Sequence, residues 1–319
     1  MRNQILAMEG SRLTAQEAAS LEKQLEQKPG DIEARIQLLG YYFQKQLQDP
    51  TALKANLQNI LWLIQNAPEC DILATPFGLL YAKVNSDGYA AGKEAWLNQL
   101  ENDPENLSVL ENAAKYFTLT DPDLANEALL KAQSLDQDNP KWSAALGELY
   151  SLNMNTKTVK DKRSEAIKAL EELENAFNRS TELEQAALLP QLAEAARVAQ
   201  ETENAREYAE IMLSQSDSEW NCENHLHHGN ITLGKLALAA GDVETARQHL
   251  LKAADTSGSP GLNSFGPDMN LAKELLQKGE KDAVLEYLAM CVQFWESGKE
   301  RLDQWTKCIE REEMPSDWN

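Results

Sequence analysis

Basic residues and long apolar runs are scarce in this sequence, and both scarcities argue against particular partners. The 319 residues include 30 lysines and arginines against 51 aspartates and glutamates, which gives a formal net charge of −21. A chain this acidic repels the phosphates of nucleic acids and of anionic membranes. The longest apolar run, residues 60–64, is far shorter than the roughly 20 residues that a membrane-spanning helix needs. We therefore expect neither a nucleic acid nor a membrane as partner.

Cysteines are also few and widely separated, at Cys70, Cys222, Cys291 and Cys308. They form no Cys-x-x-Cys pair, so the sequence predicts neither a disulfide framework nor a ribbon-type zinc site. No apolar signal-peptide core follows Met1. We expect reduced thiols and a cytoplasmic location, although an export signal that has been removed would leave no trace.

Glycine and proline are sparse, with 15 and 11 residues, while apolar residues recur at intervals of three and four. This periodicity predicts an all-α protein. A short helix pair cannot bury its apolar face alone, so it stacks on copies of itself. The sequence contains such copies, in which an aromatic residue follows a small residue by three positions: Gly40 and Phe43, Gly78 and Tyr81, Ala114 and Phe117, Gly147 and Tyr150.

The small residues of these four copies are 38, 36 and 33 positions apart. The spacing of three within each copy places both residues on one helical face, where a neighbouring helix can approach closely beside a large side chain. A proline precedes each predicted first helix, at Pro29, Pro68, Pro104 and Pro140. The most complete single copy lies further along the chain, at Leu233, Gly234, Gly241, Ala246, Leu250 and Ala253.

This pattern resembles that of tetratricopeptide repeat proteins, whose unit of about 34 residues carries Leu-Gly, Tyr, Gly, Ala, Phe, Ala and Pro at fixed offsets. The resemblance covers roughly residues 31–290. It implies a right-handed α-solenoid with a concave groove that is lined by the first helix of each repeat. The chain would then consist of a capping helix within residues 1–30, repeats over 31–154, irregular helical repeats over 155–215, and further repeats with closing helices over 216–319.

Three of the four histidines fall within residues 225–228. On a helix, Cys222, His225 and His228 follow one another at intervals of three, and these residue types are candidate ligands for zinc or another divalent metal. Two other interpretations stay open. The histidines pack and hydrogen-bond between helices, or His228 faces the groove of the tetratricopeptide frame and contacts a ligand.

A turn-rich stretch over residues 257–267 separates two strongly helical segments, and loops of this length in a solenoid usually carry a function. Asn263, Ser264 and the backbone amides before a helix expected near Pro267 and Asp268 are candidates for an anion- or peptide-binding corner. The alternative is a simple connection in which serine and asparagine cap the neighbouring helices. With the histidine segment, this stretch also resembles a signature of bacterial tetratricopeptide-like proteins.

The resemblance implies a scaffold that holds a peptide or partner protein in its groove, and the net charge of −21 favours a basic or neutral partner. The repeat frame places five side chains in that groove, namely Lys115, Glu148, His228, Ile231 and Lys235. The alternative function is an enzyme or metal-dependent binding protein at the histidine cluster and the 257–267 stretch. A structural subunit that assembles through its capping helices is a third possibility. The usual motifs of nucleotide hydrolysis, dinucleotide binding and serine esterases are absent, so a binding role is the leading expectation.

The acidic C-terminal region contains three tryptophans, Trp295, Trp305 and Trp318. We expect Trp295 and Trp305 to seal the last helices against each other. Trp318 lies in a tail, where the sequence is compatible with a free side chain or with one that binds the groove.

Overall fold

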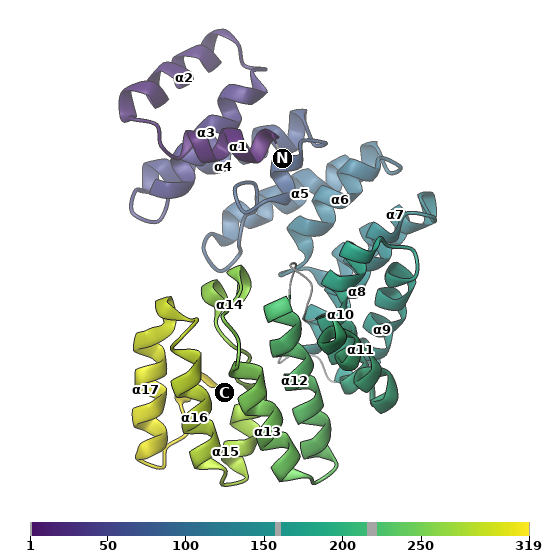
Figure 1. The fold of residues 1–319 in the computed structure, drawn as a ribbon. Helices are drawn as coiled ribbons and strands as arrows, with labels where there is room; N and C mark the ends of the chain where they lie inside the picture. Colours follow the sequence, from purple (N-terminus) through teal and green to yellow (C-terminus); the bar gives the residue numbers. More distant parts are fainter. Residues whose placement is uncertain (1, 157–160, 216–221, 319) are drawn as a thin grey trace. The chain divides into compact units, whose positions relative to one another are not determined.

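The computed structural model describes residues 2–156, 161–215 and 222–318. Over these residues the chain forms seventeen α-helices and three short 3₁₀ helices, with no strand (Figure 1). The all-α class predicted from the periodicity is confirmed. None of the described helices combines the length and the apolar character that crossing a bilayer requires. The chain divides into two compact units, Met1–Trp142 and Ser143–Asn319, which are called unit 1 and unit 2 below.

Unit 1 contains the elements α1 (Arg2–Gly10), α2 (Ala15–Gln27), α3 (Ile32–Lys45), α4 (Pro50–Asn66), η1 (Asp71–Ala74), α5 (Ser86–Asn102), α6 (Leu107–Phe117) and α7 (Pro122–Leu135). Polar side chains fix where several of these helices begin, because they accept hydrogen bonds from amides that the helix leaves unpaired. Asp31 caps α3 and Asn106 caps α6 in this way. Within residues 1–30, α2 begins with a capping box formed by Thr14 and Glu17.

Helix α1 is not foreseen by the repeat pattern, and it packs on α3. Two glycines make this close approach possible. A Cβ atom on Gly10 would lie 2.0 Å from the carbonyl oxygen of Gln37, and one on Gly40 would lie 1.8 Å from that of Ala7. The close approach predicted at Gly40 is therefore confirmed, and the approaching helix is α1.

The second copy of the repeat pattern departs from the prediction. The pattern predicts a first helix around Gly78, but residues 75–85 form turns and only η1 is helical in this region. The side chain of Asn112, on α6, donates to the carbonyl oxygens of Pro68 at 2.8 Å and Cys70 at 3.2 Å. These bonds tie the irregular segment before η1 to α6.

Unit 2 contains α8 (Pro140–Met154), whose first turn belongs to unit 1, followed by α9 (Lys162–Phe177), α10 (Glu182–Ala199), α11 (Thr202–Ser214), α12 (Cys222–Ala239), α13 (Val243–Ala254), α14 (Pro260–Phe265), α15 (Asn270–Gln277), α16 (Lys281–Cys291), η2 (Glu296–Gly298), α17 (Lys299–Glu310) and η3 (Ser316–Trp318).

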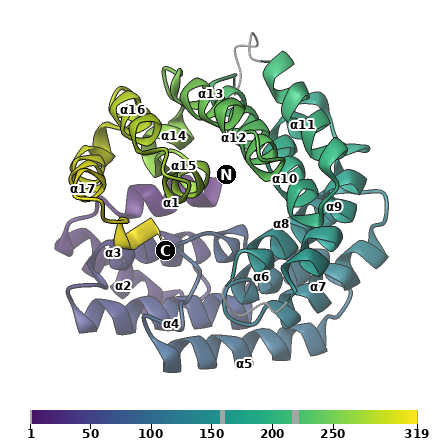
Figure 2. The same ribbon diagram turned by 90° about the horizontal axis from the view of Figure 1, so that it is seen from below.

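Most of these helices lie in two rows (Figure 2). Helix α10 contacts α12, and α12 contacts α15, so these three form what is called the first-helix row below. Helices α9, α11, α13 and α16 pack against them and form the second-helix row. Each first helix also contacts the second helix that follows it, α10 with α11, α12 with α13 and α15 with α16. Such sequential pairing fits a helical repeat array.

Two glycines determine how α12 meets its neighbours. A Cβ atom on Gly234 would lie 2.3 Å from the side chain of Leu271, so the glycine allows α15 to approach α12. Gly241 has a φ angle of +84°, which a side chain disfavours, and it makes the turn into α13. Both positions match the Leu-Gly pair and the turn of the repeat pattern.

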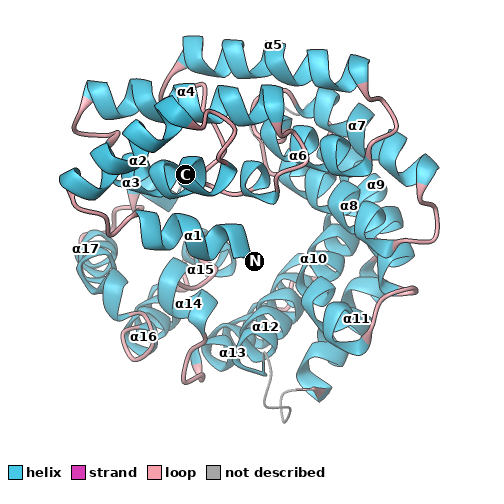
Figure 3. Ribbon diagram, turned by 90° about the horizontal axis from the view of Figure 1, so that it is seen from above, coloured by secondary structure: helices cyan, strands magenta, loops and turns pink. Residues whose placement is uncertain are grey.

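The stretch over residues 257–267 is not the open loop that its composition predicts, because its middle forms α14 (Figure 3). Gly258 and Gly266 flank this short helix with φ angles of +89° and +85°. A Cβ atom on Gly266 would lie 2.6 Å from the ring of Trp295, so the segment packs closely on that ring. The glycines that suggested a loop thus form the turns on either side of α14 and let it pack on Trp295.

The three C-terminal tryptophans are all buried. Trp295 and Trp305 have ring centroids 5.9 Å apart within a large apolar cluster of unit 2, as the sealing role predicts. Trp318 is 8% exposed and packs edge-on against Trp305, with centroids 5.4 Å apart. The Trp318 side chain is therefore not free, and its ring lies against α17 and not in the predicted groove.

Candidate functional site

The histidine segment lies in the first half of α12, where it contacts helices on both sides. His225 and His227 have no exposed surface. The Nε2 atom of His225 is 2.9 Å from the carbonyl oxygen of Ala186 on α10, and the Nδ1 atom of His227 is 2.8 Å from that of Ala253 on α13. These two histidines therefore bridge α12 to both neighbours, in agreement with the packing interpretation of the cluster.

His227 also accepts a hydrogen bond from the backbone. The Asp268 amide donates to its Nε2 atom at 3.0 Å. Because Nε2 accepts, the ring proton belongs on Nδ1, which donates to Ala253. Burial and the neighbouring His228 lower the pKa of His227 to about 4. The ring is thus held neutral between α13 and the start of α15.

His228 lies on the next position of α12 and is half-buried. Its ring meets that of His227 edge-on, with centroids 5.1 Å apart. Burial lowers the pKa of His228, against the opposing effect of the Asp268 carboxylate. His228 therefore sits next to charged groups and keeps some access to solvent.

The structure does not bring the candidate metal ligands together. Within the described part of the chain, no three side chains of histidine, cysteine, aspartate or glutamate are grouped so that they could share a metal ion. The reason lies in the helix itself, since six residues of rotation point Cys222, His225 and His228 in different directions. His225 in turn is directed at the backbone of α10.

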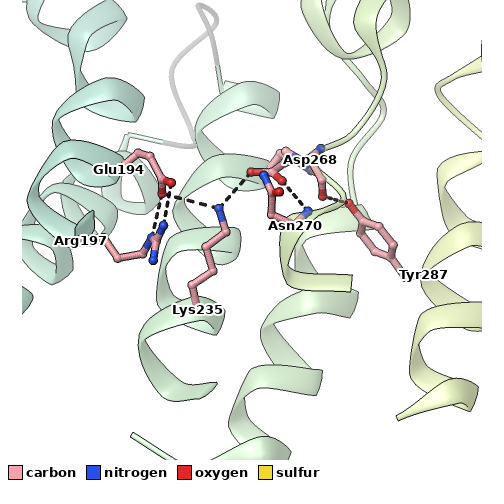
Figure 4. A network of polar contacts seen from close by, with 7 residues as sticks. Glu194, Arg197, Lys235, Asp268, Asn270 and Tyr287 are labelled. Atoms are coloured by element: carbon pink, nitrogen blue, oxygen red, sulfur yellow. Dashed lines mark hydrogen bonds and ion pairs between the residues drawn. The ribbon is translucent and has the colours of Figure 1, made fainter. Parts of the chain in front are cut away.

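A buried lysine stands at the centre of a charged network that joins all three helices of the first-helix row (Figure 4). The side chain of Lys235, on α12, is 4% exposed. Its Nζ atom lies 3.6 Å from a carboxylate oxygen of Glu194 on α10 and 3.3 Å from one of Asp268, just before α15. Arg197 holds Glu194 from the other side with two hydrogen bonds of 2.8 and 2.7 Å.

Both carboxylates of this network stay ionised. Burial alone would raise the pKa of Glu194, but the hydrogen bonds from Arg197 and the charge of Lys235 lower it below its usual value. The pKa of Asp268 is lowered in the same way, since the charge of Lys235 and the Asn270 amide outweigh burial. The network therefore consists of two cations and two anions at neutral pH.

The backbone of Asp268 extends the network to the second-helix row. Its carbonyl oxygen accepts a hydrogen bond of 3.0 Å from the hydroxyl of Tyr287, which lies on α16. Its carboxylate accepts from the Asn270 amide at 2.7 Å, at the first position of α15. One residue thus contacts α12, α15 and α16, and it fixes the start of α15 relative to both rows.

These contacts bear on the predicted anion- or peptide-binding corner. The helix expected near Pro267 and Asp268 begins at Asn270, whose amide donates to the Asp268 carboxylate. Asn263 and Ser264 lie on α14 with exposed surfaces. With its amide nitrogen directed at the carbonyl oxygens of Ser259 and Phe294, at 3.1 and 2.9 Å, the Asn263 side chain anchors α14.

The structure separates the five predicted groove positions into different environments. Ile231 is 2% exposed within the apolar cluster of unit 2, and Lys235 is enclosed by its two carboxylates, so neither side chain is available to a partner. His228 is half-buried beside the network. Lys115 is half-buried on α6 in unit 1, and Glu148 is exposed on α8 in unit 2.

Three members of the network were missed by the sequence analysis, namely Glu194, Arg197 and Asp268. Glu194 and Arg197 are three residues apart on one helix, which is a common surface pair and gives no sign of burial. Asp268 follows a proline in a turn-rich stretch and resembles an ordinary cap. Only their position beside Lys235 distinguishes them.

No protein-family model matches this chain, and no curated protein has a similar sequence. The resemblance to tetratricopeptide repeats therefore depends on the repeat pattern of the sequence, together with an all-helical structure whose sequential pairing is compatible with it.

Proposed function

We propose that the chain is a non-enzymatic scaffold of the tetratricopeptide type, which binds an extended segment of a partner protein along the first-helix row of unit 2. The observation that carries this proposal is the charged network around Lys235, which ties α10, α12 and α15 together. A surface built from several helices binds best when those helices are fixed before the partner arrives. Buried ion pairs add little net stability, so their value here is a defined geometry.

The histidines support a scaffold over an enzyme. A general acid or base has to reach its substrate and needs a pKa near the working pH. His225 and His227 are without exposed surface, and the pKa of His227 is lowered to about 4. Both rings hydrogen-bond to backbone groups of neighbouring helices. These properties suit cross-links between helices.

The partner that this surface favours is neutral or basic. Glu194 and Asp268 are 28% and 22% exposed, so a partner segment can approach their carboxylates from solvent. Glu274, on the exposed side of α15, adds a further negative charge close enough to influence Arg197. With a net charge of −21 over the chain, long-range attraction also selects positive segments.

Site-specific photo-crosslinking tests this proposal. A photoreactive residue would replace Gln191, three residues before Glu194 on α10, or Glu274 on α15, whose charge acts on Arg197; both positions are exposed. Matched control positions are Glu207 on α11 and Gln248 on α13, which are exposed on the second-helix row. We expect the first pair to capture a shared partner and the second pair to capture none.

The captured protein would then be purified and its affinity measured directly. Arginine at Gln191 or Glu274 should weaken binding at least tenfold, on the order of 1.4 kcal/mol, because it repels a basic segment and blocks the row. Arginine at Glu207 or Gln248 should leave the affinity unchanged. Equal losses from both rows, or capture from the second-helix row alone, would refute the proposal.

A further inference from the structure

The last helices of unit 2 carry an aromatic surface formed by Trp295 and Trp305. Gly298 and Gly266 both lie against the Trp295 ring, where Cβ atoms would come within 2.1 and 2.6 Å of it. Trp295 is thereby fixed by η2 and by the end of α14. Trp305, on α17, packs on Trp295 with ring centroids 5.9 Å apart, so the two rings form one aromatic surface.

The C-terminal tail reverses direction after α17 and lies on this surface. Glu312 adopts a φ angle of +62°, which is rare for a residue with a side chain, and this turn sends the chain back. Met314 and Trp318 then join the same apolar cluster as Trp305. The Trp318 carbonyl accepts a hydrogen bond of 2.7 Å from Nζ of Lys273 on α15.

This arrangement has the form of a bound peptide. One large aromatic side chain is inserted against a fixed ring, and one lysine recognises the main-chain carbonyl of the same residue. Within the tail, the Trp318 amide donates a hydrogen bond of 3.2 Å to the Pro315 carbonyl, and at its start the Glu313 amide donates to the Cys308 carbonyl at 2.9 Å. Tryptophan anchors of this kind dominate the affinity of short peptides for proteins.

We propose that Lys273, Trp295 and Trp305 form a binding subsite for a tryptophan-bearing peptide segment, and that the chain's own tail fills this subsite as an exchangeable internal ligand. Because Lys273 lies on α15, the subsite adjoins the first-helix row. The inference rests on the proposed function only where it names a partner segment that competes with the tail for this subsite. A partner with a tryptophan anchor would displace the tail. Because the tail competes for the subsite, such a partner has to bind more tightly than it would to an empty subsite.

Peptide binding in trans tests the subsite in the full chain. The probe is a fluorescein-labelled, amidated peptide with the sequence of residues 314–318, and binding is read by fluorescence anisotropy. In the wild-type protein the tail occupies the subsite, whereas Trp318→Ala removes the side chain that fills it. We expect saturable binding to Trp318→Ala and binding at least tenfold weaker to the wild type.

Two further variants and a second peptide establish the recognition chemistry. Adding Lys273→Met to Trp318→Ala removes the carbonyl contact and should weaken binding several-fold. Adding Lys278→Met instead, at an exposed lysine just after α15, changes the same charge and should have no effect. A peptide with alanine in place of tryptophan should bind none of the proteins.

A folded Trp318→Ala protein that fails to bind the peptide would overturn the inference, and so would equal binding to the wild type. If circular dichroism shows that Trp318→Ala is unfolded, a protease site placed between Glu313 and Met314 replaces it. After cleavage of the folded protein, release of the tail on dilution would support exchange, and permanent retention would contradict it. None of these measurements uses the partner, so a failure of the crosslinking experiment leaves them unaffected.

Discussion

At the residue scale, the buried lysine of α12 determines how much the network contributes to stability. Replacing Lys235 by methionine keeps the aliphatic stem but leaves the carboxylates of Glu194 and Asp268 facing each other. Breaking a fully buried pair costs about 3–5 kcal/mol, and the partial exposure of both carboxylates lowers this to about 2 kcal/mol. Urea unfolding at pH 7 measures the loss.

The matched control for this change is Lys252→Met, at an exposed position of α13. It should alter the free energy of unfolding by less than about 0.5 kcal/mol. If Lys235→Met were as stable as this control, the network would be dispensable and the proposed preorganisation of the first-helix row would lose its physical basis.

His227 makes the stability of unit 2 depend on pH. Its folded-state pKa of about 4 lies below the usual value of 6.5, so between these limits the unfolded chain binds a proton that the folded chain excludes. The contribution of the neutral ring is complete above pH 6.5 and is lost as the pH falls toward 4. Between pH 6.5 and 5 the loss is on the order of 2 kcal/mol.

His227→Gln, which cannot titrate, isolates this effect. Glu194 and Asp268 stay ionised over pH 5–7 because their pKa values are lowered, and His228 is present in both proteins. The variant should be less stable than the wild type at pH 7, and this difference should shrink at pH 5. A difference that is constant between pH 7 and 5 would show that His227 is not held neutral.

The sequence predicted this site only in part, for a reason that residue spacing explains. His228 and Lys235 are seven positions apart on α12, so the helical frame placed them on one side of that helix. Asp268 lies 33 residues beyond Lys235, and its local sequence does not predict that its side chain contacts that lysine. The frame also assigned Lys235 to the groove, because it could not show that two carboxylates from other helices enclose its charge.

At the element scale, Gly40 controls whether α1 docks on α3. In Gly40→Ala the methyl group meets the backbone of Ala7, which cannot move aside as a side chain would. The helices have to separate, at a cost of about 2–3 kcal/mol. Gly30→Ala is the control, since a Cβ atom there has no atom within 4 Å. Hydrogen exchange should become faster in α1 for Gly40→Ala only.

The repeat pattern succeeded at Gly40 and failed at Gly78, although both glycines fit it equally well. At Gly40 the chain on either side is a regular helix, α3, with a buried apolar face. Around Gly78 the chain turns instead, and Asn112 supplies hydrogen bonds that let the preceding segment stay irregular. A pattern of single residues records close packing, and it does not record whether the packed glycine lies in a helix or in a turn.

At the scale of the whole molecule, the net charge of −21 should govern how stability responds to salt. Like charges repel in the folded chain, and salt screens exposed charges far more than buried pairs such as that of Lys235. Raising sodium chloride from about 20 to 300 mM at pH 7.5 should therefore raise the melting temperature by a few degrees. At pH 5, where part of the acidic charge is neutralised, the increase should be smaller.

The same screening separates the two binding modes proposed for unit 2. Binding of a basic segment near Glu194 and Asp268 relies on exposed charge, so its affinity should fall as salt rises. The tail subsite relies on two tryptophan rings and one hydrogen bond, so peptide binding to Trp318→Ala should change less than twofold over the same range. Calorimetric titration at both salt concentrations measures the two responses. A melting temperature that falls with salt would mean that favourable ion pairs outweigh repulsion, and the preference for basic partners would then need a local cause.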